Sequence, residues 1–141
     1  MKILAVLVTA ILMISGYTPV QASSPSESTS SSTSQKRAEL LQYSKDTDLK
    51  SLAKNGKTVV FFFATWCPNC VLTLTELSEK WSELDPSLTL VIADYDQEVA
   101  LKSEYGVTYQ DTFVLLTPEG EVKRRWNAGG VDGINKNIAE Q

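Results

Sequence analysis

The sequence predicts an α/β fold in which a βαβ half is followed by a ββα half around one central mixed sheet flanked by helices. Residues 59–63 form a continuous apolar run, which is typical of a central strand covered on both faces, and residues 88–93 are predicted to form a second apolar strand. Residues 67–84 have helical spacing and connect them, so we expect a right-handed crossover with parallel strands. A hairpin pattern and a last helix supply the second half.

The composition limits the available chemistry. The 141 residues carry a formal net charge of -4, with two cysteines and no histidine. The chain therefore cannot supply a histidine general base, a Ser-His-Asp triad or a histidine ligand for zinc or haem. Two cysteines cannot complete a four-cysteine metal site. The acidic balance argues against nucleic acid or an anionic membrane surface as the main partner, and the length suits one folded domain.

Residues 1–22 are predicted to be a secretory signal peptide. Lys2 precedes an apolar run of 12 residues, which is too short to span a bilayer because a span needs about 20 residues. Helix breakers and a cleavage pattern ending at Ala22 follow, so we expect export to a bacterial periplasm, cell envelope or extracellular space. Cleavage leaves no stable membrane span. A buried N-terminal helix or an uncleaved anchor is the alternative.

Residues 23–35 are predicted to be a disordered linker. Serine and threonine dominate this segment, and it holds no apolar side chain that could bury a core. The folded domain is therefore expected over residues 36–141.

The sequence predicts some of the first helices and strands of this domain more clearly than others. Residues 37–43 fit either a strand or a helical turn. The polar residues 46–48 can cap a helix that stops at Asn55-Gly56. In the long helix, residues 67–84, one side is predicted to be apolar and the other polar. The apolar side holds Leu74, Leu77, Trp81 and Leu84, and the polar side holds Thr73, Glu76, Glu79 and Lys80.

Shorter elements complete the chain. A short helix is expected over residues 97–105, strands over 113–116 and 121–126, and a final helix over 132–139. The basic residues 123–125 are expected to be a solvated edge that discourages sheet pairing, with a docking patch for an acidic partner as the alternative.

Both cysteines fall in one motif, Cys67-Pro68-Asn69-Cys70, where the first apolar strand ends and the long helix starts. Unpaired backbone N–H groups and the helix dipole stabilise a thiolate at such a place, and cysteines there can have pKa values of roughly 3.5–7.5. Cys67 is therefore the candidate attacking thiol, and Cys70, about one turn further, the candidate resolving thiol. Pro68 suits the first turn because its missing N–H would be unpaired there.

Two other interpretations of this pair stay open. A structural disulfide is a fair expectation in an exported protein, although so short a loop constrains the unfolded chain very little. The pair could also be half of a metal or Fe–S site that a second molecule completes. We favour redox exchange, which needs no cofactor because the dithiol itself carries two electrons.

The active-site segment of the thioredoxin family resembles the stretch FFFATWCPNC of this chain. The family's third strand and following helix resemble DYDQEVALKSEYGV, its hairpin DTFVLLTPEGEV, and its C-terminal end NAGG with the last helix. This resemblance covers about residues 36–141 and implies a thioredoxin-like fold and thiol–disulfide oxidoreductase activity. By position it implies that Cys67 attacks, that Cys70 resolves and forms the redox disulfide with it, and that Trp66 flanks the site. Simple packing is the alternative role for Trp66.

The clearest departure from the family lies at Asp111, which stands where the family usually has a cis-proline. A cis bond before another residue costs about 2.5–4 kcal/mol, so we expect a trans bond here. A carboxylate near the thiols would raise a thiol pKa and oppose the helix dipole. Asp111 and Thr112 are therefore predicted to shape the site, and the missing proline could open it to a metal. The alternative is that Asp111 is a solvated loop residue or a turn cap.

Two further departures concern protons and charge. Phe61 stands where many thioredoxins have a buried acid, so proton transfer on Cys70 must use water or another group. The dipeptide Pro68-Asn69 is neither the Gly-Pro of reducing thioredoxins nor the Pro-His of a strong periplasmic oxidant. Asn69 can donate hydrogen bonds to a thiolate but has no charge.

The sequence thus predicts a monomeric, exported thiol–disulfide oxidoreductase that exchanges disulfides with protein substrates and is restored by a redox recycling partner. The alternatives are a metal- or Fe–S-binding module of the same fold, and an exported scaffold with an inert disulfide.

Overall fold

The computed structural model describes residues 36–140, so the predicted signal peptide and linker lie outside the described residues. No helix within this range is both long enough and apolar enough to cross a membrane. The elements follow one another in the order β1 (Glu39–Gln42), α1 (Leu49–Asn55), β2 (Lys57–Phe63), α2 (Pro68–Lys80), a 3-10 turn η1 (Trp81–Glu83), β3 (Leu88–Asp94), α3 (Val99–Tyr105), β4 (Thr112–Leu116), β5 (Val122–Asn127) and α4 (Gly130–Ala139).

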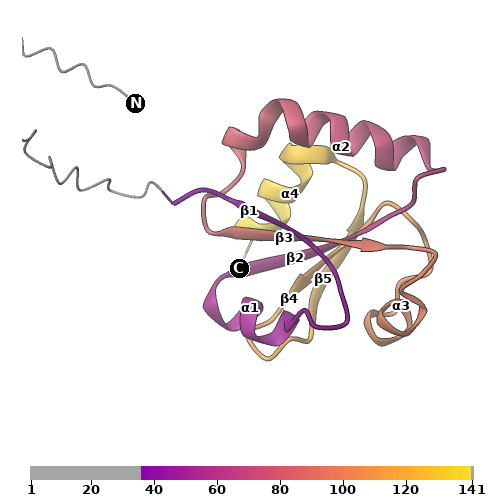
Figure 1. Ribbon diagram of the computed structural model, residues 1–141. Coiled ribbons are helices and arrows are strands. Elements are labelled where there is room, and N and C mark those ends of the chain that lie inside the picture. Colours follow the sequence, from indigo (N-terminus) through magenta and orange to yellow (C-terminus); the bar gives the residue numbers. More distant parts are fainter. Residues whose placement is uncertain (1–35, 141) are drawn as a thin grey trace, which may run out of the picture. The chain divides into compact units, whose positions relative to one another are not determined.

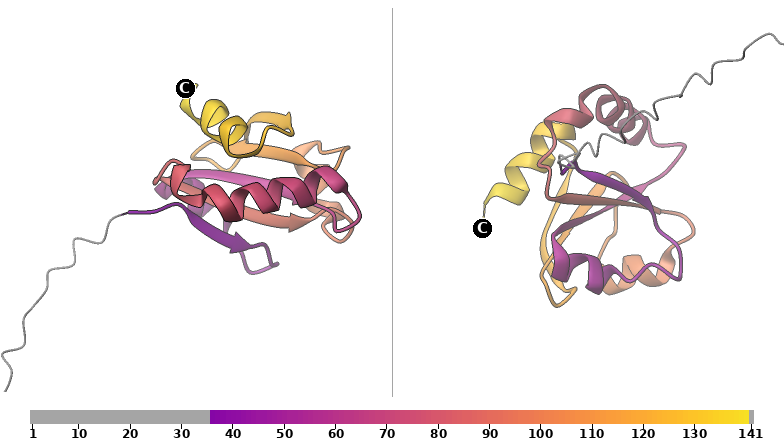
Figure 2. Two further views of the ribbon diagram at one scale, coloured as in Figure 1. Left: turned by 90° about the horizontal axis from the view of Figure 1, so that it is seen from above. Right: turned by 60° about the vertical axis from the view of Figure 1, so that its left-hand side comes forward.

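The strands form one five-stranded mixed sheet in the order β1-β3-β2-β4-β5. Strands β1, β3 and β2 are parallel, while β4 pairs antiparallel with β2 and β5 antiparallel with β4. Helices α2 and α4 cover one face and α1 and α3 the other (Figure 1). On their shared face, α2 and α4 lie side by side (Figure 2). The predicted fold class and the parallel crossover are confirmed.

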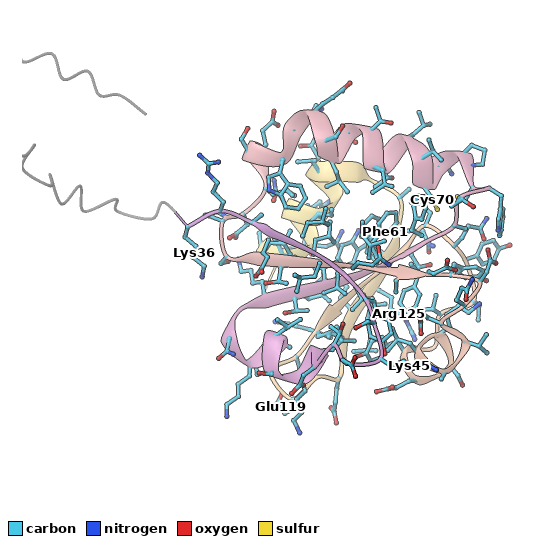
Figure 3. All side chains as sticks on the ribbon, viewed as in Figure 1. Lys36, Lys45, Phe61, Cys70, Glu119 and Arg125 are labelled. Atoms are coloured by element: carbon cyan, nitrogen blue, oxygen red, sulfur yellow. The ribbon has the colours of Figure 1, made fainter. Side chains whose placement is uncertain are left out.

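The position of β2 in the middle of the sheet explains why residues 59–63 are apolar without interruption. Val59 and Phe61 point into the core under α2 and α4, whereas Val60 and Phe62 point into the core on the other face. All four side chains are fully buried. Successive side chains of a strand face opposite sides of the sheet, so residues 59–63, which are covered on both sides, are apolar at every position. Phe61 lies in the middle of the domain, between the sheet and α2 (Figure 3).

Helix α2 is shorter than predicted, and one residue, Thr73, was assigned to the wrong face. Residue 67 caps the helix, which ends at Lys80, and the 3-10 turn η1 replaces its expected last turn, as helix ends often do. Thr73, expected on the polar side, is buried. It lies three residues after Cys70 and four before Leu77, which is the spacing of one helix face, and all three side chains face the sheet.

Other boundaries moved by a few residues. Residues 37–43, left open between strand and turn, contain β1, an edge strand of the sheet. The predicted cap of α1 is confirmed, because the Asp48 side chain accepts a hydrogen bond from the Ser51 N–H at 2.9 Å. Helix α4 starts at Gly130 rather than at residue 132. The chain enters it through three successive residues with positive φ, residues 128–130, of which two are glycines and adopt this geometry easily.

The basic residues of β5 lie on an edge strand, as predicted, but a solvated edge does not describe all of them. Arg125 donates hydrogen bonds to the carbonyls of Tyr105 and Gly106, where α3 ends. Arg124 forms an ion pair with Glu140. These two arginines therefore tie the edge strand to neighbouring helices.

Candidate active site

The two cysteines lie where β2 leads into α2. Cys67 is the N-cap of α2, and its Sγ accepts a hydrogen bond from the Cys70 N–H at 3.2 Å. Pro68 occupies the first turn, as the sequence predicts. Cys70 lies under the first turn of α2 (Figure 3). Both thiols are free in this structure, so it represents the dithiol form, and the predicted disulfide between them stays a prediction.

Both thiols are buried, and the surroundings of Cys70 raise its pKa. Cys67 is 3% exposed and Cys70 is fully buried. Burial raises the pKa of Cys70 to about 12; the hydrogen bond with Cys67 and the charge of Asp111 also raise it, while a backbone hydrogen bond at Ala64 opposes the rise. Cys70 is therefore a thiol at neutral pH, and it needs a proton acceptor before it can attack a disulfide.

Asp111 is buried beside the thiols. Its peptide bond is trans, its φ is +56°, and it is 5% exposed. The interpretation as a solvated loop residue is therefore wrong. Its N–H donates to the Phe62 carbonyl at 3.1 Å, and its own carbonyl accepts from the Ala128 N–H at 3.2 Å. The Thr73 hydroxyl donates to its Oδ1 at 3.4 Å. Burial raises the pKa of Asp111, and the Thr73 hydrogen bond opposes this rise.

Thr112 fixes the loop that carries Asp111. Its hydroxyl donates to the Tyr109 carbonyl at 2.7 Å and accepts a hydrogen bond from Asn127 Nδ2 at 2.7 Å. Thr112 is buried, so these bonds satisfy its hydroxyl group within the protein. Sequence reasoning missed Asn127. Its only signal is its position at the end of β5, directly before the glycine-rich entry to α4.

Trp66 forms the exposed side of the site. Its ring is 58% exposed, so burial in the core does not describe it. The indole Nε1–H donates to Asp96 Oδ2 at 2.8 Å, and the ring meets Tyr95 edge-on with centroids 6.5 Å apart. Asp96 was also missed, although it follows β3, whose carboxyl end adjoins that of the parallel strand β2. The neighbouring residue Asn69 is exposed.

No cluster of three or more His, Cys, Asp or Glu side chains that could hold a metal is found within residues 36–140. A metal or Fe–S site on the cysteine pair would therefore need ligands from outside residues 36–140. Phe61, at the position of the family's buried acid, stacks on Phe113 with centroids 4.3 Å apart. The site therefore offers two thiols one helical turn apart and a single buried carboxylate, an arrangement suited to thiol–disulfide exchange.

Comparison with known proteins agrees with this geometry. The family model described as Thioredoxin matches residues 39–140. Thioredoxin Asp f 28 of Aspergillus fumigatus is 32% identical over 92 residues, which are 63% of this chain and 82% of that protein. Thioredoxin-2 of Pyricularia oryzae is 39% identical over 75 residues, 52% of this chain, and this chain matches only 43% of that longer protein.

Solved structures give the same result for the fold. The reduced thioredoxin pre-protein of Schistosoma mansoni superposes with a TM-score of 0.59 at 28% identity, covering 72% of this chain and 97% of that one. Mitochondrial thioredoxin 3 of Saccharomyces cerevisiae, in its oxidised form, also gives a TM-score of 0.59, at 24% identity over 72% of this chain and 95% of its own.

Proposed function

The chain belongs to the thioredoxin family and is a thioredoxin-type thiol–disulfide oxidoreductase, and from this premise we propose that it is exported and exchanges disulfides with proteins of the bacterial cell envelope. The observation that carries the activity is the CxxC pair itself. One thiol caps a helix N-terminus, the other lies one turn further along the helix, and both are buried. At the first position the sulfur accepts a backbone N–H at the start of the helix, and at the second the raised pKa keeps the thiol protonated until it is needed.

In the reducing direction, the Cys67 thiolate attacks one sulfur of a substrate disulfide. A mixed disulfide forms, and the other substrate sulfur leaves as a thiolate. Cys70, after losing its proton, attacks Cys67 Sγ and releases the second substrate sulfur. The substrate gains two electrons, the pair becomes a Cys67–Cys70 disulfide, and a recycling partner must restore the dithiol. The oxidising direction is the reverse of these steps.

Support for export comes from the N-terminal sequence. A basic residue, a short apolar run and a small residue at position 22 have the order of a secretory signal, and a serine-rich segment follows. We propose that cleavage after Ala22 releases a monomer tethered or free outside the cytoplasm. Producing the full chain in a bacterium, fractionating the cells and weighing the product tests this. A mature chain starting at Ser23 in the periplasm or medium is expected, and an uncut cytoplasmic chain contradicts it.

The activity is tested by equilibrating the purified protein with glutathione redox buffers and counting free thiols by alkylation and mass. We expect a reversible dithiol–disulfide transition with a defined potential, which also shows whether the protein works as a reductant or an oxidant. Failure to exchange at any poise contradicts the proposal. Metal bound in stoichiometric amount would then support the metal module, and a disulfide resistant to mild reductant would support the inert scaffold.

Protein substrates are tested by trapping. The variant Cys70→Ser can attack but cannot resolve, so we expect it to accumulate mixed disulfides with cell-envelope proteins that reductant releases. Cys67→Ser is the matched control and should trap none. Equal trapping by both variants, or by neither, contradicts the assigned roles of the two thiols.

A further inference from the structure

The buried carboxylate of Asp111 contacts the face of α2 that carries Cys70. Thr73, whose hydroxyl donates to Asp111 Oδ1 at 3.4 Å, follows Cys70 by three residues in α2. Side chains at this spacing are neighbours on one helix face, and both of these face the sheet. Within residues 36–140, Thr73 is the only side chain that hydrogen-bonds the Asp111 carboxylate, and no cation pairs with it.

The backbone holds Asp111 in an uncommon conformation. Its φ of +56° lies in the left-handed region, which Asp tolerates better than most residues. Hydrogen bonds to Phe62 and from Ala128 fix its peptide groups between β2 and the entry to α4. Residues kept in such conformations cluster at active sites, where surrounding structure determines them.

We propose that Asp111 is the proton acceptor for Cys70 in the step that resolves the mixed disulfide, because its carboxylate is fixed next to Thr73 on the buried helix face that carries Cys70. The inference deepens the proposed function and rests on it. At the family's usual acid position this chain has a stacked phenylalanine, Phe61. Among residues 36–140, Asp111 is the carboxylate whose charge acts on the buried Cys70 thiol.

In the resolving step, one proton moves from Cys70 to Asp111 and one S–S bond replaces another. The Cys70 S–H gives its proton to the Asp111 carboxylate, and the new thiolate attacks Cys67 Sγ. The S–S bond between Cys67 and the substrate breaks, and the substrate sulfur leaves with the electron pair and takes a proton from solvent. The buried site keeps one negative charge until the substrate sulfur leaves, because Asp111 becomes neutral as the Cys70 thiolate forms. Asp111 then returns its proton to solvent. A separated thiolate next to a charged Asp111 would place two negative charges in low dielectric.

Within residues 36–140, few groups act on Cys70 and Asp111. Cys67 and Asp111 are the titratable groups that act on the pKa of Cys70, and burial and Thr73 act on that of Asp111. From β2, Phe62 contributes only a carbonyl, and from the loop before α4, Ala128 contributes only an N–H. The burial-raised pKa of Asp111 brings the acceptor closer to neutral pH, where a general base works best.

The test separates attack from resolution with 5,5′-dithiobis(2-nitrobenzoate) as the probe disulfide. Attack by Cys67 releases the first coloured thiolate at a rate that depends on probe concentration. Resolution by Cys70 releases the second at a rate that does not. In Asp111→Asn we expect the second phase to slow by about tenfold or more at neutral pH, with the first phase unchanged. The charge-matched control Glu79→Gln, on the solvent side of α2, should change neither phase.

A purely electrostatic or structural role predicts the opposite sign. Removing the Asp111 charge lowers the pKa of Cys70, so without a proton-accepting role the second phase would become faster. A smaller slowing than tenfold, or an increase, therefore overturns the inference. Asp111→Gly keeps the left-handed backbone without the carboxylate and should match Asp111→Asn. If both variants fold, as shown by an unchanged first phase, the result decides the question.

The pH profile gives a second readout. In the natural protein, the rate of the second phase should fall as pH drops through the pKa of Asp111. This acidic limb of the pH–rate profile should be absent in Asp111→Asn. Thr73→Val removes the hydroxyl that lowers the pKa of Asp111, so the limb should move to higher pH. A profile identical in all three proteins overturns the inference. Absence of both phases from the natural protein would instead refute the proposed function itself.

Discussion

Asp85 joins the starts of two neighbouring strands, and its removal should weaken the fold in a pH-dependent way. Its Oδ2 accepts a hydrogen bond from Lys57 Nζ at 2.7 Å, and its Oδ1 accepts from the Ser87 hydroxyl at 2.6 Å and the Ser87 N–H at 2.8 Å. Lys57 begins β2, and residue 87 directly precedes β3. The perturbation is Asp85→Asn, which keeps the size of the side chain and removes its charge.

The size of the effect follows from the pKa. The hydrogen bond from Lys57 and those from Ser87 lower the pKa of Asp85 from 3.8 to about 2. At about 1.36 kcal/mol per pKa unit, this gives roughly 2.4 kcal/mol as an upper value. The Lys57 and Asp85 side chains are 26% and 29% exposed, so solvent screens the pair. We therefore expect Asp85→Asn to lose about 1–1.5 kcal/mol of unfolding free energy at neutral pH.

The direction in which folding shifts the pKa of Asp85 determines the sign of the pH dependence. Because the folded pKa lies below the unfolded value of 3.8, the stabilisation is fully present above pH 3.8 and is lost as pH falls through about 2. Urea unfolding of both proteins from about pH 7 to about pH 2.5 should show the difference shrinking in acid. Asp46→Asn, at an exposed carboxylate, is the matched control and should match the natural protein. A difference that stays constant to the lowest pH would refute the ion pair as its origin.

Three other substitutions test other parts of the fold. Asp111→Asn should raise the urea midpoint at neutral pH, because folding raises the pKa of Asp111 and its charged form therefore destabilises the folded state. The gain should disappear in acid, and a lower midpoint at neutral pH contradicts this explanation. Gly106→Ala should cost about 1–2 kcal/mol in urea unfolding, because Gly106 has φ of +61° and an added Cβ would collide with the Arg125 guanidinium; an unchanged midpoint contradicts it. Phe113→Leu should cost about 1–3 kcal/mol by the same assay, since this ring stacks on both Phe61 and Trp126, and a loss below that range would contradict a stabilising role for the stack.

The sequence predicted the cysteine site because its signals are local. A continuous apolar strand, a proline suited to a first helical turn and a helix-spaced segment occur in that order, so the motif could be placed at the strand–helix junction. The burial of Thr73 could not be predicted in the same way. A threonine fits either face of a helix, and the neighbour that favours the buried face, Asp111, is 38 residues away.

The contact between Trp66 and Asp96 on the exposed side of the site also forms only when the sheet is folded. Trp66 and Asp96 are 30 residues apart and meet because β2 and β3 are parallel and end at the same edge. Sequence reasoning placed both strands but could not assign partners among the side chains of the loops that follow them. Asn127 was missed for the same reason, since its partner Thr112 pairs with it across β4 and β5.

The residues at positions 61 and 111 both differ from the usual family pattern, and the structure gives a physical reason for each. An acid in place of Phe61 would replace a fully buried ring that stacks on Phe113, so the charge would lie inside an aromatic core. At position 111 a carboxylate has the Thr73 hydroxyl as a donor and a backbone fixed by hydrogen bonds on both sides. A proline could not take this conformation, because its ring holds φ near −65° whereas Asp111 has φ of +56°. Placing the acid in the loop therefore requires the proline to be absent, and it leaves the aromatic core of β2 intact.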